Sequence, residues 1–527
     1  MSTRRVWLLI GIGAVLLVTS YPPFALVPLT PALSFIAVIP AVLLIAQLAA
    51  DADPRRAFKW GFWYGFASHS LVLYWLIVAL WRFTKLSALG FLATVAIIAL
   101  LHGVTFWFLV RVRGRLPRVP LWVVFPVAWT TLEWTIGHLG DIRFPWLGLG
   151  TSLADALVPA QWADIVGARG LTFWLAWCGA FLADGWTDGR MDSGMRYLTR
   201  RVAPVALTVV LAAGYGVWRM QMLPLRDVGV IGMVQPNVGY SEKWDAIRAD
   251  GIVSDLMSLS IQVQAVSRPD LIIWPEAAIP GYVQGEPDWD QAIIRFARAG
   301  HTPLLVGGLY ADLSTRERPY YNAAFLYDST GDRTRQPIYG KHYLVPIVER
   351  VPFVPPRWFK GMTFFGGFSR GKDFPLFQVG VGRFGVAICY ESIFESLARR
   401  YRRTGADFLV NITNDAWYGL TSAPYQHESH LVLRAIETRM GVARAANSGI
   451  SEFLDPLGRA FQSTKLEERT IVSGTLRTSD VVPLYVRLGD WVGVLVVVGT
   501  LSMGALLLLD RLRVKGLKPP LGDATRP

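Results

Sequence analysis

The sequence predicts a bundle of membrane-spanning helices joined to one large α/β domain. The first observation is composition: of the 527 residues, 52% are hydrophobic and only 17% are charged. The mean hydropathy is +0.36, which is too apolar for an ordinary soluble protein. The second observation is that long apolar runs fill the first 219 residues and return near the C-terminus. The third is that the region between them holds only short apolar runs separated by turn residues.

About eight segments have the roughly 20 mostly apolar residues that a bilayer span needs. They cover residues 6–22, 25–48, 60–80, 87–110, 120–138, 168–186, 203–219 and 489–510. The second span contains three prolines and is expected to be kinked or partly interfacial. The fifth is the weakest, because Glu133 lies inside it. The start of the chain is similar to a signal peptide but has no convincing cleavage site, so we interpret it as an uncleaved first helix.

Basic residues indicate on which side of the membrane each connection lies. They gather before the first span, after the eighth and in alternate connections, whereas the loops 81–86 and 139–167 carry few. The clusters are Arg4, Arg5, Arg55, Arg56, Lys59, Arg111, Arg113, Arg115, Arg118, Arg190, Arg196, Arg200, Arg201, Arg511, Arg513, Lys515 and Lys518. Since positive charge marks the cytoplasmic side, both termini are predicted to be cytoplasmic. The same pattern explains the net charge of +13 without nucleic-acid binding.

This topology divides the chain into four parts. Residues 1–219 contain spans one to seven, residues 220–488 form a large outer domain, residues 489–510 form the eighth span, and residues 511–527 form a cytoplasmic tail. The outer domain contains short apolar runs such as VGVIGMVQPN, PDLIIWPE, FGVAICYE and ADFLVNITND, which are typical of buried strands. Helical patterns over 285–299 and 426–445 lie between some of them. Strands that alternate with helices predict an α/β domain.

Cys389 is one of only two cysteines and ends the apolar run FGVAIC. Cys178 lies in a predicted span, so we expect neither a disulfide nor a structural zinc site. Ser392 and Glu395 fit a capping box, which predicts a helix that begins just after Glu391. A thiol near the positive end of a helix has a lowered pKa. This favours a nucleophile, although a buried small hydrophobic side chain is the alternative.

Two other charged residues lie beside apolar runs. Glu276 ends DLIIWPE, where a carboxylate costs free energy unless it is paired; the alternative is a carboxylate at a helix start. Lys341 lies among aromatic and apolar neighbours in YGKHYLVPIVERVPF; the alternative is a solvated loop lysine. The residues alone leave both alternatives open.

The motifs WPE, GKHYLVPIVERVP and CYES, in this order, resemble the Glu–Lys–Cys triad motifs of the nitrilase (carbon–nitrogen hydrolase) superfamily. With spans on both sides of the domain, nearly the whole chain is similar to the apolipoprotein N-acyltransferase family. The similarity extends to FPWLGLG at 144–150, VQPNVGYSEKWD at 234–245, YNAA at 321–324, NITNDAWYG at 411–419 and RAIETRMGVARAANSGIS at 434–451. Tyr418 departs from the family pattern, in which Phe is expected. The resemblance implies an αββα sandwich for the outer domain.

The resemblance also implies roles for single residues. Glu276 would be the general base, Lys341 the stabiliser of the tetrahedral intermediate and Cys389 the nucleophile. The residues implied to support the site are Glu349, Tyr390 and Glu391. The residues implied to bind substrates are Trp244, Trp417, Asn322 and Trp146. The last of these lies in the outer loop 144–162, which is interpreted as part of a lipid entrance.

The implied reaction is acyl transfer from a phospholipid, with phosphatidylethanolamine as the expected donor, to the α-amino group of diacylglyceryl-cysteine on an apolipoprotein. A thioester on Cys389 would divide this reaction into two steps. The implied location is a bacterial inner membrane, with residues 220–488 in the periplasm. We expect no metal and no other cofactor, since the sequence has no P-loop, no dinucleotide fingerprint and no His/Cys cluster. The aromatic, glycine-rich segment 351–371 is interpreted as a lid or membrane-dipping arm, with a packed loop as the alternative.

Two other functions remain open. A membrane-tethered amidase of the nitrilase type would use the same triad with water as the acceptor, but a single anchor would suffice for it. A transporter or receptor with a ligand-binding outer domain would need charged residues along a path through the spans. The spans offer little beyond His69, Glu133 and Asp184. Substituting Cys389 by Ala would separate a binder from an enzyme.

Overall fold

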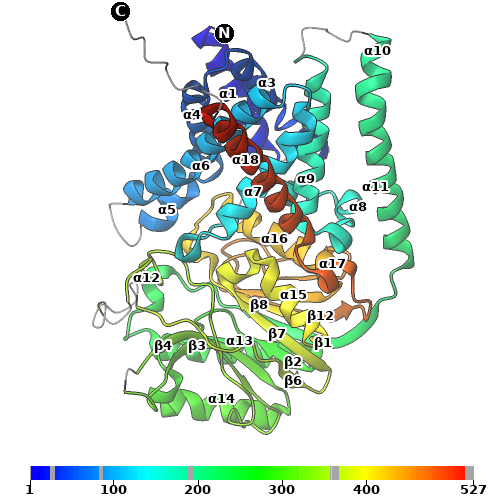
Figure 1. Cartoon of the computed structure of the whole chain (residues 1–527). Coiled ribbons are helices and arrows are strands. Elements are labelled where there is room, and N and C mark those ends of the chain that lie inside the picture. Colours follow the sequence, from blue (N-terminus) through cyan, green and yellow to red (C-terminus); the bar gives the residue numbers. More distant parts are fainter. Residues whose placement is uncertain are drawn as a thin grey trace, which may run out of the picture.

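The computed structural model describes residues 2–23, 30–81, 87–146, 148–187, 194–316, 318–355, 358 and 367–516. This part of the chain forms a bundle of helices and, at one end of the bundle, two β-sheets with their covering helices (Figure 1). The N-terminus lies at the end of the bundle that faces away from the sheets (Figure 1). Part of the predicted lid, residues 356–357 and 359–366, lies outside the described residues, so its interpretation stays a prediction.

Each of the eight predicted spans coincides with a helix or a pair of helices. The bundle consists of α1 (Thr3–Thr19), α2 (Thr30–Ile36), α3 (Ile39–Ala50), α4 (Pro54–Val72), α5 (Trp75–Trp81), α6 (Ser87–Arg115), α7 (Leu121–Gly137), α8 (Leu157–Ala160), α9 (Ala163–Asp184), α10 (Met195–Tyr197), α11 (Ala203–Met222) and α18 (Trp491–Gly516). Among the described residues, five helices are long and apolar enough to cross a membrane, or six if α4 and α5 form one span. The predicted number of about eight is therefore not confirmed, because α1 and α7 have only 17 residues each.

The third predicted span is a broken helix. α4 begins after Asp53, whose carboxylate accepts two backbone N–H groups of the first turn at 3.0 and 3.1 Å, and Pro54 suits the first helical position. α4 packs closely on α6 because Gly61 lacks a side chain: a Cβ there would lie 2.6 Å from Cβ of Phe106. After Val72 the chain bends by 61° into α5. Figure 1 shows α5 at the edge of the bundle, on the side nearer the sheets.

Two six-stranded sheets follow the bundle. Their strand orders are β12-β1-β2-β3-β4-β5 and β11-β10-β9-β8-β7-β6. In each sheet three neighbouring strands are parallel, β1 to β3 in the first and β7 to β9 in the second, and the outer pairings are antiparallel. The strands are β1 (Arg226–Gln235), β2 (Leu271–Ile273), β3 (Leu304–Ala311), β4 (Tyr320–Tyr327), β5 (Tyr339–Gly340), β6 (Phe377–Val379), β7 (Gly382–Ile388), β8 (Phe408–Thr413), β9 (Gly441–Ala446), β10 (Glu452–Leu454), β11 (Ala460–Phe461) and β12 (Thr470–Thr478).

The short apolar runs become strands because both of their faces are covered. Every residue of β8 and β9 is buried, as expected for parallel strands between two layers. The remaining helices are α12 (Tyr240–Lys243), α13 (Ala249–Ser267), α14 (Pro287–Gly300), α15 (Glu395–Arg403), α16 (Ala423–Thr438) and α17 (Leu484–Leu488). α13 and α14 pack on the first sheet, and α15 and α16 pack on the second. The predicted α/β fold is confirmed.

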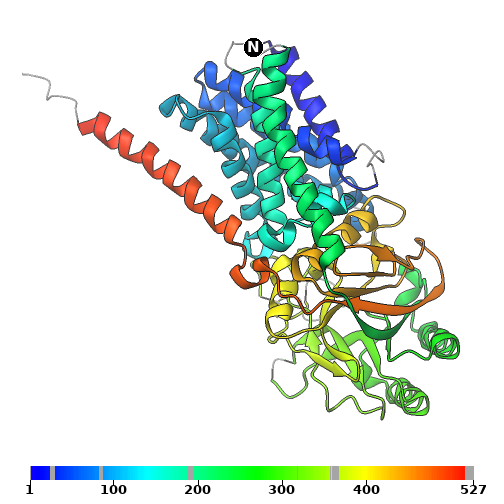
Figure 2. The same cartoon turned by 90° about the vertical axis from the view of Figure 1, so that its right-hand side faces the viewer.

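Buried ion pairs join the bundle to the sheets. Arg169 of α9 pairs with Glu395 at the start of α15 and, at 2.6 Å, with Asp490 just before α18. Asp164 of α9 lies 2.8 Å from Arg439, which follows α16. Removing one partner of such a pair leaves an uncompensated buried charge, which is strongly destabilising. The pairs therefore hold the sheets at one end of the bundle, whereas α18 leans away from the other helices (Figure 2).

The capping box predicted after Cys389 is wrong. The helix expected just after Glu391 begins at Glu395, and no side chain caps it. Partners from distant parts of the chain bind both residues of the predicted box. Ser392 Oγ lies 2.8 Å from Nε2 of His427, and Glu395 pairs with Arg169. The capping-box pattern fails to predict the structure here because tertiary contacts bind both side chains.

The helical pattern over 426–445 is partly wrong. α16 ends at Thr438, and Arg439 adopts a left-handed φ of 55°. The chain then continues as β9. The apolar residues after Arg439 are therefore buried in a sheet instead of on the face of a helix.

Candidate active site

The three predicted catalytic residues meet where strands of the two sheets end. Glu276 lies shortly after β2, Lys341 directly follows β5 and Cys389 directly follows β7. All three side chains are buried. Cys389 opens a 3-10 turn with a φ of 50°, a left-handed conformation that costs free energy in a residue other than glycine. The surrounding contacts must therefore hold the thiol in this position.

Hydrogen bonds connect Glu276, Lys341 and Glu349 into one cluster. Lys341 Nζ donates to Oε1 of Glu276 at 3.1 Å and to Oε1 of Glu349 at 2.9 Å. The side-chain amide of Asn322 donates to the same two oxygens at 2.7 and 3.1 Å. The backbone N–H of Asn414 donates to Oε2 of Glu276 at 3.0 Å. Asn322 thus holds the two carboxylates, although we predicted it as a substrate contact.

Burial and charge set the protonation states of the cluster. Burial disfavours the ammonium of Lys341, but the carboxylates of Glu276 and Glu349 outweigh it and raise its pKa well above the usual value. Burial, and then the charge of Glu276, raise the pKa of the Cys389 thiol. The lowered thiol pKa expected from a helix N-terminus is therefore wrong, because α15 begins further along the chain. Cys389 accordingly rests as a thiol.

The carboxylate of Glu391 joins the loops that carry the lysine and the nucleophile. Its Oε1 accepts the two backbone N–H groups that directly follow Lys341, at 2.7 and 3.1 Å. Its Oε2 accepts the N–H of the residue directly before Cys389 at 2.8 Å and the hydroxyl of Tyr339 at 2.7 Å. Burial raises the pKa of Glu391 to about 7, while these donors favour the ionised form. Its position suits the supporting role that we predicted.

Tyr390 attaches the nucleophile turn to the bundle. Its hydroxyl donates to the carbonyl oxygen of Arg143 at 2.7 Å, and its ring stacks on Phe144 with centroids 6.2 Å apart. Both partners lie in the connection between α7 and α9. Tyr390 therefore fixes the turn at the junction of the sheets and the membrane helices.

A polar network behind Cys389 was not found by sequence reasoning. Nε2 of His427 lies 3.1 Å from the carbonyl oxygen of Cys389 and 2.8 Å from Ser392 Oγ. Its Nδ1 lies 3.1 Å from Oδ1 of Asp415, and Arg444 pairs with Asp415 at 2.7 Å. All of these groups are buried. The network holds the left-handed backbone of the nucleophile, but no spacing in the sequence indicates that its members meet.

An apolar pocket of about 140 Å³ opens beside Cys389. The four predicted substrate-binding residues, Trp244, Trp417, Asn322 and Trp146, all line it. So do Glu276, Lys341, Glu349 and Tyr390. The structure therefore brings every site residue predicted from the sequence to this pocket except Glu391, which lies behind it.

One wall of the pocket comes from the bundle. Leu76, Ala79 and Leu80 of α5 line it together with residues of the sheets. Trp146 and Trp75 both donate their indole N–H to Oε1 of Gln426 on α16, at 2.9 and 3.1 Å. The pocket is thus shared between the membrane helices and the α/β domain.

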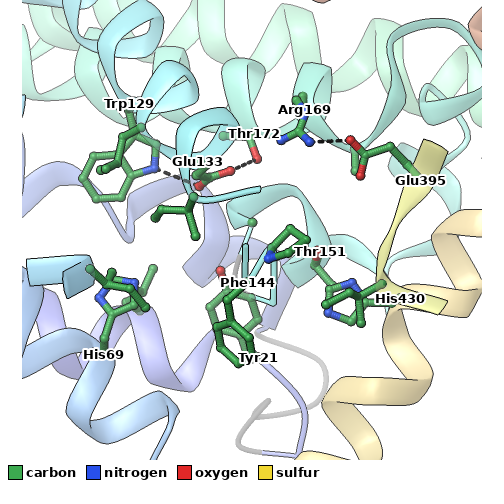
Figure 3. Close-up of a pocket in the computed structure, with 18 of the residues that line it drawn as sticks. Tyr21, His69, Trp129, Glu133, Phe144, Thr151, Arg169, Thr172, Glu395 and His430 are labelled. Atoms are coloured by element: carbon green, nitrogen blue, oxygen red, sulfur yellow. Dashed lines mark hydrogen bonds and ion pairs between the residues drawn. The ribbon is translucent and has the colours of Figure 1, made fainter. Parts of the chain in front are cut away.

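A second, more polar cavity of about 50 Å³ lies where the bundle meets the α/β domain, and Phe144 lines both cavities. Figure 3 shows Glu133 in its wall. The Glu133 carboxylate accepts from Trp129 Nε1 at 3.0 Å, from Leu149 N at 2.9 Å and from Thr172 Oγ1 at 2.7 Å. A carboxylate among membrane helices needs such donors. The cavity also has the size and polarity to hold ordered water.

Comparisons with known proteins match both parts of the chain. Residues 13–181 match the model of the apolipoprotein N-acyltransferase N-terminal domain, and residues 231–485 match the carbon–nitrogen hydrolase model. The apolipoprotein N-acyltransferase of Geobacter metallireducens is 33% identical over 492 residues, which is 92% of each chain. That of Chlorobaculum tepidum is 29% identical over 91% of this chain and 92% of its own. That of Caulobacter vibrioides is 30% identical over 92% of this chain and 90% of its own. The similarity therefore spans the bundle and the sheets together.

Proposed function

This chain belongs to the apolipoprotein N-acyltransferase family, and on that basis we propose that it transfers an acyl chain from a phospholipid to a lipoprotein. The acceptor is the α-amino group of an N-terminal diacylglyceryl-cysteine, and phosphatidylethanolamine is the expected donor. The observation that carries the proposal is the position of Cys389, in an apolar pocket whose walls come from both α5 and the sheets. A lipid ester can enter such a pocket from the bilayer.

In the first half-reaction Glu276 accepts the thiol proton while the sulfur of Cys389 attacks the ester carbonyl. The carbonyl oxygen becomes an oxyanion and needs a donor that is already in place. Lys341 uses two of its N–H groups on Glu276 and Glu349, which leaves the third for the oxyanion. The glycerol oxygen then leaves with the proton from Glu276. Lysophospholipid departs, and a thioester remains on Cys389.

In the second half-reaction the neutral amine of the lipoprotein attacks the thioester. Glu276 accepts a proton from the amine and returns it to the departing sulfur of Cys389, so that an amide forms and the thiol is restored. Asn322 and the backbone of Asn414 keep the Glu276 carboxylate in place during both steps. The apolar pocket walls exclude water, which protects the thioester until the amine arrives.

The proposal includes the location of each part of the chain. Residues 1–219 and 489–510 cross the inner membrane of a bacterium, residues 220–488 form the catalytic domain in the periplasm, and residues 511–527 lie in the cytoplasm. The support is the alternation of basic clusters along the chain. The attachment of both sheets to one end of the bundle agrees with it (Figure 2).

Mass spectrometry of the intact protein tests the proposal. Wild type incubated with phosphatidylethanolamine is expected to carry one acyl group on Cys389, and the Cys389→Ala variant none. Adding a diacylglyceryl lipopeptide should remove the adduct and yield the N-acylated peptide. A wild-type protein that forms no adduct contradicts the mechanism. Release of free fatty acid without peptide acylation would indicate the hydrolytic alternative instead.

A further inference from the structure

A second lysine is buried beside the catalytic cluster and has no part in the mechanism above. Lys243 is the last residue of α12, and its side chain is only 2% exposed. Its Nζ donates to the backbone carbonyl oxygen of Glu276 at 2.9 Å. Within the described part of the chain, no carboxylate oxygen lies within 4.0 Å of this nitrogen. A buried ammonium without a direct ion pair is costly and calls for a functional explanation.

The charges around Cys389 supply that explanation. Glu276 and Glu349 share the single ammonium of Lys341, so two negative charges and one positive charge leave this cluster at −1. When Glu276 takes the thiol proton, one negative charge moves from Glu276 to the sulfur of Cys389 and then to the oxyanion, so the net charge stays at −1. In a site of low dielectric constant, this uncompensated negative charge is unfavourable. One more cation brings the resting cluster to neutrality.

Lys243 is charged under physiological conditions and acts on the two reacting groups. Burial lowers the pKa of Lys243 to about 8, and the charges of Glu276 and Cys389 oppose that shift. The ammonium is therefore mostly protonated at neutral pH. Its hydrogen bond to the Glu276 backbone also fixes α12, and with it Trp244, against the strand end that carries the base.

We infer that Lys243 is a positioning residue of the catalytic cluster: it holds the backbone of Glu276 and supplies the second positive charge that balances the negative charge developing at Cys389. This inference rests on the proposed function for the roles of Glu276 and Cys389. A purely structural alternative is that Lys243 only anchors α12. The two roles differ in charge, because an anchor needs a hydrogen-bond donor and the inferred role also needs a cation.

The test measures the reactivity of Cys389 without any lipid. Cys178→Ala leaves Cys389 as the sole cysteine, since the chain has two. In this background, the full-length protein in detergent is alkylated with iodoacetamide over neutral to alkaline pH. Lys243→Gln keeps a donor for the Glu276 carbonyl but removes the charge, and Lys243→Arg keeps the charge. Lys465→Gln changes an exposed lysine of the same domain and is the matched control.

We expect Lys243→Gln to lower the alkylation rate about tenfold at neutral pH, because loss of the cation raises the thiol pKa by about one unit. Above pH 8 the difference from wild type should vanish, since Lys243 itself loses its proton there. Lys243→Arg stays charged and should keep the wild-type rate at neutral pH, and Lys465→Gln should match wild type. Thioester formation from phospholipid should slow in Lys243→Gln through kcat, with KM unchanged, because Lys243 does not line the pocket as described.

Three results would overturn the inference. One is a wild-type alkylation rate in Lys243→Gln at neutral pH. Another is an equal loss of rate in Lys243→Gln and Lys243→Arg, accompanied by equal losses in thermal unfolding temperature, which indicates anchoring alone. The third is a rise in KM with unchanged kcat. Because alkylation needs no acyl donor, a failure of the proposed acyl transfer and a failure of the Lys243 inference are distinguishable.

Discussion

Replacing Glu391 by Gln tests whether this buried carboxylate positions the nucleophile. A Gln amide has one oxygen and one NH2 group where the carboxylate has two acceptors. The oxygen can still accept the two N–H groups that follow Lys341, and the hydroxyl of Tyr339 can turn to accept from the new NH2 group. The N–H just before Cys389, now 2.8 Å from Oε2, then faces a donor and loses its partner. The loss of a hydrogen bond is therefore expected at the residue next to Cys389.

The expected size follows from that single lost bond. A hydrogen bond to a charged group contributes about 1.5–3 kcal/mol. If this free energy appears in the activation barrier, thioester formation slows roughly 10- to 100-fold. If it appears in folding, the free energy of unfolding falls by about the same 1.5–3 kcal/mol. A role limited to the helix dipole predicts only about 0.3–1 kcal/mol and no kinetic effect.

The assay separates the two half-reactions of Glu391→Gln. Rapid quenching with mass spectrometry gives the rate of thioester formation, and pre-acylated enzyme mixed with lipopeptide gives the rate of transfer. Thermal unfolding in detergent reports stability. Glu286→Gln, an exposed carboxylate on the same domain, is the control and should behave as wild type. Normal unfolding together with normal rates in both steps would refute the positioning role of Glu391.

Three further changes test other parts of the site and the topology. Glu276→Gln should slow thioester formation at least about 100-fold through loss of the base. The Cys389 thiol of the same variant should nevertheless react faster with iodoacetamide at a given pH. The charge of Glu276 raises the pKa of Cys389, so removing that charge lowers the thiol pKa. Slower alkylation would contradict the reasoning. His427→Phe leaves the Cys389 carbonyl and one oxygen of Asp415 without their imidazole partner. Each buried polar group without a partner costs about 1–3 kcal/mol, so thioester formation should slow about tenfold or more. A wild-type rate would show that His427 does not support the site. A reporter enzyme fused near residue 330 should be active only outside the cytoplasm, and activity inside would show that the predicted span number is wrong by one.

Sequence reasoning predicted which residues meet where a single segment holds the whole signal, while the catalytic roles of these residues remain our proposal. Glu276, Lys341 and Cys389 each lie in a motif of a few residues, and strand ends bring such motifs together in an α/β fold. The apolar runs also predicted the strands, because a strand that is buried on both faces consists almost entirely of apolar residues. The helices of the bundle follow from the same reasoning, although α1 and α7 are too short to confirm their spans.

Sequence reasoning failed where partners come from distant segments. His427 on α16, Asp415 after β8 and Arg444 on β9 meet only because three elements pack around one turn. Ser392 and Glu395 have the correct spacing for a cap, but stronger partners elsewhere in the fold bind them. Lys243 directly precedes Trp244 in the chain, but no local pattern indicates that its nitrogen reaches Glu276.

The ion pairs between α9 and the later parts of the chain have a consequence for biosynthesis. A ribosome completes Asp164 275 residues before its partner Arg439, and Arg169 226 residues before Glu395 and 321 residues before Asp490. Asp164 also pairs with Arg219, only 55 residues later. The printed partners of Arg169 lie only in the later segments, so Arg169 must stay unmatched in the nascent bundle until most of the polypeptide has been made. Translation that stops before residue 490 leaves Arg169 without one of its two carboxylates. We expect cellular proteases to degrade such truncated chains, so that mainly full-length protein accumulates in the membrane.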